Sequence, residues 1–269
     1  MESVGPEGYR KLYASLIANG VIPRLVAGQA VNFWATLYRD KEPELANFEP
    51  YTSTDLELFD MTIPEHSIEN LPDGQIRRED VFSRMTGPDS AMVSYREGEQ
   101  FRSVSIMTNL LGLERGEIEK RSAKVVMDGL PLFVLDPIAL AKGKTANLVH
   151  LDQLRGKDLK HLQMSLLCSR AYIREILAKD SPRACLNAIE RVIELSDSSN
   201  GRKVVQQHRI DWTTCVPWQD LENRKGSEPK VAKFLSLRAP QWRRSLQGGF
   251  PGDPGESERP SPERDDHVL

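Results

Sequence analysis

The hydrophobic positions at the start of the chain recur every three to four residues, which is the period of an α-helix. They predict a helix over residues 9–18, ended by Asn19-Gly20. A short apolar stretch at 24–27 predicts a first strand, and helical spacing returns over 29–38. We interpret Ala27-Gly28-Gln29 as the tight turn between that strand and that helix.

The next strand alternates acidic and apolar residues from Asp55 to Phe59. Because side chains on a strand alternate faces, Asp55 and Glu57 point to one side while Leu56 and Leu58 point into a core. Two carboxylates on one face repel each other unless a cation lies between them, and they suit a hard divalent ion such as Mg²⁺. The alternative is a solvent-facing edge strand, although Asp and Glu are disfavoured in strands.

The pattern up to residue 136 predicts a loop, a short helix, a hairpin, a second helix and a strand. Their expected positions are 40–50 for the loop, 78–85 for the short helix, 91–95 and 101–107 for the hairpin, 114–126 for the second helix and 130–135 for the strand. This order indicates an α/β (α+β) fold, with a small mixed sheet and flanking helices.

After Pro137 the pattern is almost entirely helical. Helices are expected over 138–151 and 157–178, and Ser181-Pro182 is a typical helix start. Residues 197–201 are expected to break the helix that follows.

These shifts in pattern divide the chain into three parts. We predict an α/β core over 8–136, a helical C-terminal region over 137–247, and a disordered acidic tail over 248–269.

Composition narrows the class of protein. A hydrophobic fraction of 39% and a charged fraction of 28% are ordinary for a globular chain. Cys168, Cys185 and Cys215 lie far apart, which argues against a disulfide framework or a zinc site. The acidic start is unlike a signal peptide, and no apolar run could span a bilayer. We therefore expect a cytoplasmic protein without a membrane partner.

Gly28 allows two interpretations. A glycine between a strand and a helix lets the backbone approach a phosphate, where the helix N-terminus offers free N–H groups and partial positive charge. Alternatively, Gly28 only permits a tight turn.

Taken together, the glycine turn and the acidic strand resemble the nucleotidyltransferase signature of the DNA polymerase β superfamily. Residues 25–35 and 52–59 are similar to bacterial nucleotidyltransferase-like proteins related to the abortive-infection toxin group. The resemblance extends to Val134-Leu-Asp-Pro137 with Lys144, and to an Arg-x-Lys-Asp helix start within 155–162. It covers roughly residues 22–165, about half of the chain.

The resemblance implies a role for each matching residue. Gly28 and Gln29 would contact nucleotide phosphates, and Asp55 and Glu57 would hold the Mg²⁺ ions that bridge the triphosphate. Nucleotidyl transfer depends mainly on positioning and charge neutralisation, and metal ions can clamp the attacking and leaving oxygens.

Two further residues complete the implied site. Lys144 would neutralise phosphate charge, and Asp158 would position Lys144 or the acceptor. The implied activity is Mg²⁺-dependent transfer of a nucleotide from an NTP to an RNA acceptor, such as a tRNA end, or to a protein hydroxyl. The resemblance also implies a toxin-type defence role with an antitoxin partner.

The sequence departs from this pattern where a third carboxylate is expected. Ser103 and Ser105 stand on the neighbouring strand in place of an acid, and Asp128 or Asp136 could substitute for it. The loss opens the alternative of a catalytically impaired module that binds nucleotide or nucleic acid. A third alternative is a scaffold protein, which predicts no open cleft beside Gly28.

Two smaller departures concern the glycine turn. Ala27 replaces the first residue of the usual Gly-Gly or Gly-Ser pair. The spacing from Gly28 to Asp55 is also long, so an insertion must loop out at 40–50.

Other candidate motifs are weaker. Gly143-Lys144-Thr145 ends like a P-loop, but Ile138 replaces the required first glycine and the preceding residues suit a helix. Lys144 could otherwise be a solvated lysine. The histidines lack metal-binding spacing, and His161 is expected to be a packed or surface residue of its helix.

A basic stretch runs from Arg224 to Arg244, with Phe234 and Trp242 interleaved and Glu228 as its only acid. It fits either a nucleic-acid surface or a solvated helical face. The acidic tail could also fold back over it.

Overall fold

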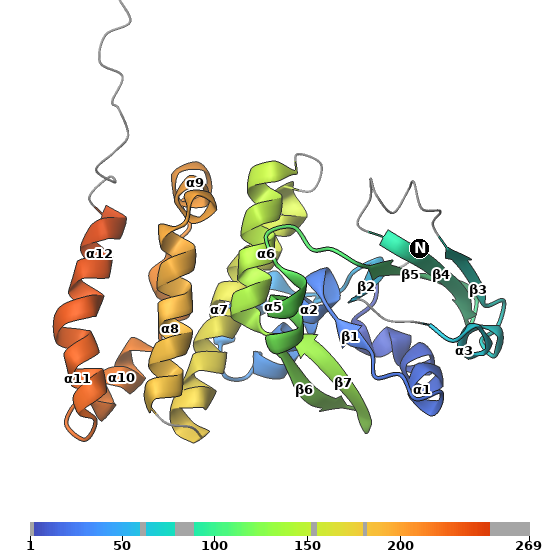
Figure 1. The fold of residues 1–269 in the computed structure, drawn as a ribbon, viewed down its shortest axis with the longest axis horizontal. Coiled ribbons are helices and arrows are strands. Elements are labelled where there is room, and N and C mark those ends of the chain that lie inside the picture. The colour runs from blue at the N-terminus through green and yellow to red at the C-terminus, as the bar shows by residue number, and fades with distance from the viewer. Residues whose placement is uncertain (1–2, 60–62, 79–88, 152–154, 180–181, 248–269) are drawn as a thin grey trace, which may run out of the picture.

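The computed structural model describes residues 3–59, 63–78, 89–151, 155–179 and 182–247. Its strands form one mixed sheet in the order β3-β4-β5-β2-β1-β7-β6 (Figure 1). The strands are β1 (Arg24–Leu25), β2 (Asp55–Phe59), β3 (Gln75–Arg78), β4 (Asp89–Glu97), β5 (Gln100–Met107), β6 (Ser122–Met127) and β7 (Leu130–Leu135).

The position of β2 decides where its two acids lie. It pairs parallel with β5 on one side and antiparallel with β1 on the other, and β1 pairs parallel with β7. The remaining pairs, β3 with β4, β4 with β5 and β6 with β7, are antiparallel. β2 is therefore an interior strand of the sheet, which excludes the edge-strand alternative for Asp55 and Glu57.

Helices alternate with the strands up to β7, and every later element in the described residues is helical. The elements around the sheet are η1 (Pro6–Tyr9), α1 (Arg10–Ala18), α2 (Ala27–Tyr38), η2 (Pro43–Phe48), α3 (Glu65–Glu69) and α5 (Arg115–Lys120). Those after it are α6 (Pro137–His150), α7 (Arg155–Lys179), α8 (Pro182–Asp197), α9 (Ser199–His208), η3 (Trp212–Cys215), α10 (Trp218–Arg224), α11 (Pro229–Lys233), η4 (Phe234–Arg238) and α12 (Ala239–Gln247). The predicted architecture, a mixed sheet with flanking helices and a helical C-terminal region, is confirmed.

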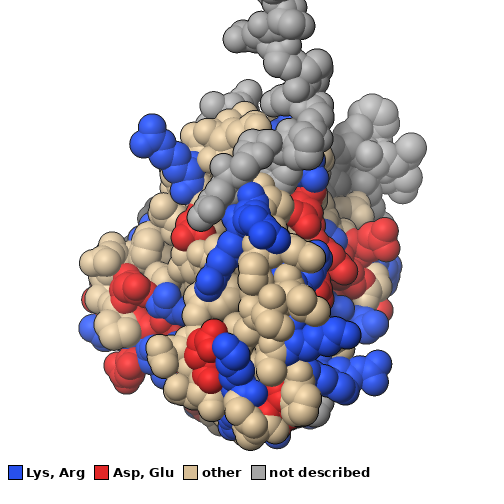
Figure 2. Space-filling model, turned by 90° about the vertical axis from the view of Figure 1, so that its left-hand side faces the viewer, with Lys and Arg blue, Asp and Glu red and all other residues tan. Residues whose placement is uncertain are grey.

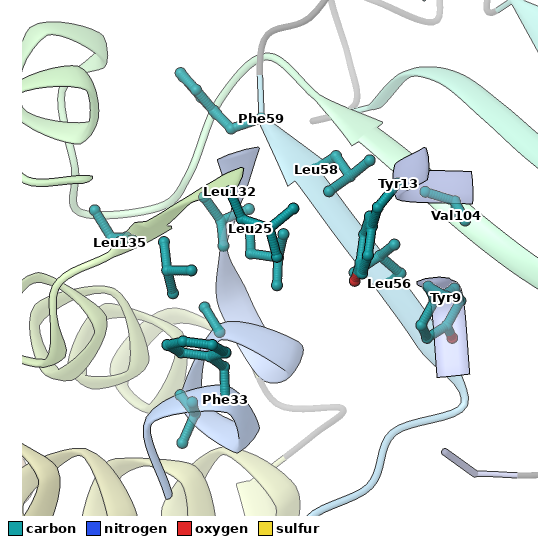
Figure 3. Packing of buried hydrophobic residues seen from close by; sticks show 14 of the residues in the cluster. Tyr9, Tyr13, Leu25, Phe33, Leu56, Leu58, Phe59, Val104, Leu132 and Leu135 are labelled. Atoms are coloured by element: carbon teal, nitrogen blue, oxygen red, sulfur yellow. The ribbon is translucent and has the colours of Figure 1, made fainter. Parts of the chain in front are cut away.

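Alternation along β2 directs its apolar residues into the core. Leu56 and Leu58 are fully buried and lie on the side of Tyr9 and Tyr13 (Figure 3). This leaves the other face of the strand for Asp55 and Glu57, as its alternating pattern predicts.

The hydrophobic residues form two clusters. One joins the sheet to α1 and α2, and the other lies among the C-terminal helices. Helices α6 and α7 contribute to both, for example through Leu140 and Leu167 in the first and Ile138 and Leu162 in the second. The division of the chain at residues 136 and 137 therefore stays a prediction.

The prediction of one helix over 114–126 is wrong. A short α5 ends at Lys120, and Ser122–Met127 forms β6 against β7. The β-branched Val125 and Val126 favour a strand, and the hairpin closes through Asp128-Gly129, both at positive φ. Strong helix formers in Glu114–Lys120 hid this boundary from the sequence pattern.

Three other differences are local. Strand β3 was not predicted, and the expected polar loop at 40–50 contains η2. The short helix expected over 78–85 begins at Arg78, which ends β3, and its remainder lies outside the described residues, as does the tail over 248–269. No helix in the described part of the chain is both long enough and apolar enough to cross a membrane.

Candidate functional site

The candidate site gathers residues from four separate segments of the chain. Asp55 and Glu57 come from β2, Gly28 from the first turn of α2, Lys144 from the middle of α6, and Lys157, Asp158 and His161 from the start of α7. Helices α6 and α7 pack against each other and against α2.

The first turn of α2 differs from the expected tight turn. The helix already begins at Ala27, whose φ of 51° lies in the left-handed region that favours glycine. In the resemblance drawn from the sequence, Ala27 stands where the first glycine of the pair is expected. The chain therefore adopts the glycine-like bend with an alanine, at a cost of about 1 kcal/mol or more in backbone strain.

Gly28 is buried where two segments approach it closely. A Cβ atom at this position would lie 3.2 Å from Cε1 of His161 and 3.7 Å from Oγ of Ser53. The absence of a side chain thus allows α7 and the segment just before β2 to approach the first turn of α2. This packing role is what the structure shows for Gly28.

Gln29 is also buried, and its side chain is held by the fold. Its Nε2 donates to the carbonyl oxygen of Val4 at 2.9 Å, and its Oε1 accepts from Nδ2 of Asn32 at 3.3 Å. A phosphate contact by this side chain would have to replace those bonds. The backbone N–H in the first turn of α2, where no side chain caps the helix, remains the other way for Gln29 to contact a phosphate.

Lys144 and Asp158 meet in the interior. The Nζ of Lys144 donates to Oδ1 of Asp158 at 2.7 Å, and the two side chains are only 8% and 3% exposed. Oδ2 of Asp158 is buried without a hydrogen-bond partner. Lys144 is therefore not a solvated lysine, and its place within α6 agrees with rejecting the P-loop interpretation.

Lys157 also belongs to the site, although the sequence interpretation gave it no role. Its Nζ donates to Oγ of Ser53 at 2.9 Å and lies 3.3 Å from Oδ1 of Asp55. Lys157 and His161 are four residues apart and share a helix face. This spacing, considered together with the acidic strand at Asp55, was the feature of the sequence from which a role for Lys157 could have been predicted.

The two carboxylates of β2 have opposite electrostatic environments. Burial alone would raise the pKa of Asp55, but a hydrogen bond from Ser53 and the charge of Lys157 bring that pKa below its ordinary value. Burial and the neighbouring charge of Asp55 raise the pKa of Glu57 to about 7. Oε2 of Glu57 is buried and has no hydrogen-bond partner.

His161 is neutral at physiological pH. Burial, together with the positive charges of Lys144 and Lys157, lowers its pKa to about 3. Its Nδ1 is buried without a hydrogen-bond partner. His161, which the sequence predicted to be a packed or surface residue, is packed beside Gly28 and lines the candidate site.

The third carboxylate is missing from the neighbouring strand. In the parallel pairing of β2 with β5, Ser103 lies opposite Asp55 and Ser105 lies opposite Glu57. No group of three or more Asp, Glu, His or Cys side chains among the described residues is arranged to hold a metal ion.

Neither proposed substitute supplies that acid. Asp136 caps α6 by accepting from the backbone N–H of Ala139 and forms a double hydrogen bond with Arg191. Asp128 is exposed in the turn between β6 and β7. The carboxylate of Asp136 is therefore already engaged, and Asp128 lies in the β6–β7 turn, whose strands do not pair with β2.

The two carboxylates of β2 suit a hard divalent cation such as Mg²⁺. Proteins commonly hold Mg²⁺ through one or two carboxylates, while water and substrate phosphates fill the other positions. Asp55 and Glu57 provide two carboxylates on one face, and the unpartnered Oε2 of Glu57 leaves an oxygen available. The pair suits a Mg²⁺ ion that arrives with a triphosphate.

The candidate site is enclosed beside Lys144 and open to solvent beside Asp55. The cavity beside Ala27 and Lys144 has a volume of about 30 Å³, which is room for about one water. The side chains of Asp55 and Lys157 are 41% and 38% exposed, so the site meets solvent there.

A larger cavity of about 390 Å³ lies between α6 and α8, away from β2. Its lining includes Lys142 and Arg191, which are paired with Glu117 at 2.6 Å and Asp136 at 2.8 Å, and also Arg121, but none of the site residues expected from the sequence. We therefore place the candidate site at β2 and not in this cavity.

Comparison with known proteins gives structural likenesses only. No protein-family model and no curated protein matches the sequence. The solved structures that are similar include the antibiotic-resistance factor ANT(2'')-Ia, at 12% identity over 76% of this chain and 95% of that one, with a TM-score of 0.40. Another is an antigenic nucleotidyltransferase-like protein from Paracoccidioides brasiliensis, at 10% identity over 70% of this chain and 95% of that one, with a TM-score of 0.37. At such low TM-scores neither likeness bears on function.

Proposed function

We propose that this chain binds a Mg²⁺–nucleoside triphosphate at the junction of α2, β2 and α7 and transfers its nucleotide to an RNA or protein acceptor. One observation carries the proposal. Two carboxylates on β2, one with a buried and unpartnered oxygen, face a pair of lysines brought there by α6 and α7.

Each residue has a role in this proposal. Asp55 and Glu57 would hold Mg²⁺, which when bound neutralises triphosphate charge and polarises the phosphoryl oxygens. Lys144, fixed by Asp158 at 2.7 Å, presents a positive charge at the floor of the site. The first turn of α2, at Gly28, would direct backbone N–H groups to the phosphates.

A second candidate function is nucleotide binding without turnover. It is favoured by Ser103 and Ser105, which stand opposite the two acids. A serine hydroxyl neither carries negative charge at neutral pH nor serves as a strong base for an acceptor hydroxyl, so these positions lack what a third carboxylate would provide.

The surface of α10–α12 favours RNA over protein as the acceptor. Five exposed cations there have no carboxylate partner within the described residues, namely Arg224, Lys230, Lys233, Arg243 and Arg244. Arg243 lies 3.8 Å above the centre of the Trp218 ring. Figure 2 views this end of the molecule and shows Lys and Arg side chains across its middle and right. Cations of this kind bind phosphates. The interleaved Phe234 and Trp242, which the sequence offered for stacking on bases, are only 7% and 1% exposed and belong to the core.

The resemblance to a toxin-related group adds a defence role to the proposal, with an antitoxin as partner. Expression of the chain in a bacterial host would then slow growth, and Asp55→Ala would relieve that effect. Equal growth with and without the wild-type chain would contradict the toxin role.

Labelling experiments test the activity itself. The chain is incubated with each labelled NTP, Mg²⁺ and total RNA or protein, and wild type is compared with Asp55→Ala. Glu99→Ala, an exposed acid in the hairpin between β4 and β5, is the matched control. We expect labelled product with wild type and the control, and a loss of about a hundredfold or more with Asp55→Ala.

Other results of the labelling experiment would support a different function. Labelling that survives Asp55→Ala would overturn the metal role of Asp55. NTP binding without labelling would favour the binding module, and the absence of both would favour the scaffold protein.

A further inference from the structure

Lys157 lies where a metal ion would compete with it. Its Nζ is 3.3 Å from Oδ1 of Asp55 and 2.9 Å from Oγ of Ser53, which itself donates to the same Oδ1 at 2.8 Å. Lysine and serine thus converge on one oxygen of the first acid of β2. Lys157 serves as an internal counter-cation for this acid.

The second acid receives no such partner. Oε2 of Glu57 is buried and unpaired, although Glu57 lies only two residues from Asp55 on the same face. One ammonium group, that of Lys157, is therefore hydrogen-bonded to the pair of carboxylates, while the ammonium of Lys144 is held by Asp158. A divalent cation would supply the second positive charge that the pair lacks.

The two lysines of the site differ in their freedom to move. Lys144 is buried and held at 2.7 Å by a buried carboxylate, whereas the side chain of Lys157 is 38% exposed and its contact with Asp55 is longer. An ion pair of that exposure contributes little stability, so it is readily exchanged. Lys157 is therefore the lysine that can leave its carboxylate.

We infer that Lys157 is a positioning residue that holds Asp55 in the metal-free protein and passes to the triphosphate when Mg²⁺–nucleotide binds. The inference rests on the proposed function. In the metal-free state its ammonium competes with the cation for Asp55. In the loaded state the same ammonium, released from Asp55, adds a charge-assisted hydrogen bond to a phosphate oxygen.

This exchange predicts effects of opposite sign from one substitution. Lys157→Met removes the competitor but keeps most of the side-chain length. Mn²⁺ alone should then bind about two- to fivefold more tightly, the range that an ion pair of this exposure contributes. A non-hydrolysable NTP with Mn²⁺ should bind about tenfold or more weakly, because a charged hydrogen bond to phosphate is lost.

The matched control is Lys160→Met. Lys160 lies in the same helix and carries the same charge, but its Nζ contacts the carbonyl oxygen of Pro50 at 3.4 Å instead of Asp55. It should change neither affinity by more than a general charge effect. Lys157→Arg, which retains the charge, should recover part of the nucleotide affinity.

Titration calorimetry and the electron paramagnetic resonance signal of free Mn²⁺ measure both affinities on the full chain. Thermal unfolding of each variant confirms that it folds. Mn²⁺ binding to Lys157→Met that is equal to or weaker than wild type, in a folded protein, would overturn the exchange while leaving the proposed function intact. Wild type that binds neither Mn²⁺ nor nucleotide would instead overturn the proposed function.

Discussion

At the scale of single residues, the two carboxylates of the site differ in the direction of their pKa shifts. Glu57 and Asp55 share a strand face, yet the pKa of Glu57 is raised to about 7 and that of Asp55 is lowered. Burial and the charge of Asp55 raise the pKa of Glu57, whereas at Asp55 the hydrogen bonds from Ser53 and Lys157 outweigh burial. Glu57 is therefore the residue whose ionisation opposes folding when no metal is bound.

This asymmetry predicts a pH-dependent effect of Glu57→Gln. The carboxyl ionises near 4.5 in the unfolded chain and near 7 in the fold, so the free energy of unfolding falls as the pH rises between these values and stays reduced above 7. The glutamine variant avoids this cost. It should gain up to about 3 kcal/mol relative to wild type between pH 4 and pH 8.

Urea unfolding of both proteins at the two pH values, with a chelator present, measures this gain. A difference in stability between variant and wild type that does not change with pH would contradict the buried, uncompensated state of Glu57.

At the scale of elements, the site depends on how α6 and α7 pack. Lys144 and Asp158 belong to different helices and are paired at 2.7 Å in the interior. Buried pairs are costly to break because the remaining partner keeps its charge without compensation. The pair therefore couples the register of the two helices to the proposed nucleotide site.

Replacing one partner of this pair should lower the free energy of unfolding much more than replacing both partners with apolar residues. Asp158→Ala should lower the free energy of unfolding by about 3 kcal/mol or more, because Lys144 is left buried and unpaired. The double variant Lys144→Met with Asp158→Leu should recover most of that loss. Chemical denaturation of the single and double variants gives the coupling energy, and additive losses would show that the two groups do not interact.

At the scale of the whole molecule, the helical region separates two charged surfaces. The acids of β2 lie in an interior strand of the sheet, and the basic surface of α10–α12 lies at the end of the molecule beyond α6–α9 (Figure 1). A local excess of positive charge stands out in a chain whose formal net charge is −3. An extended polyanion such as RNA could contact this surface without contacting the proposed nucleotide site.

Charge reversal on this surface tests the RNA contact. Replacing Lys230, Lys233 and Arg244 by Glu should weaken RNA binding and reduce the dependence of log Kd on log salt by about 2, since each phosphate contact with single strands contributes about 0.7. Binding of Mg²⁺–NTP should be unchanged. Reversal of Arg10, Lys120 and Lys124, which are equally exposed but lie on other elements, is the control.

Filter binding across a salt series measures both slopes. Equal losses in the two triple variants would show that net charge matters and that the α10–α12 surface does not.

Local pattern was enough to determine several features of this protein. Alternation in 55–59 predicted the strand and the shared face of its acids, because one buried face enforces a period of two. Helical spacing located α6 and α7 within a few residues. The absence of an acid on the neighbouring strand was also readable from Ser103 and Ser105.

Only the tertiary structure decided which residues meet. The contact of Lys157 with Asp55 spans 102 residues of chain, and nothing within α7 alone predicts it. The same holds for His161 against Gly28, and for the burial that makes Lys144 a paired interior lysine. Spacing along a helix or strand is set by local geometry, whereas burial and ion pairing depend on elements that packing brings together from distant parts of the chain.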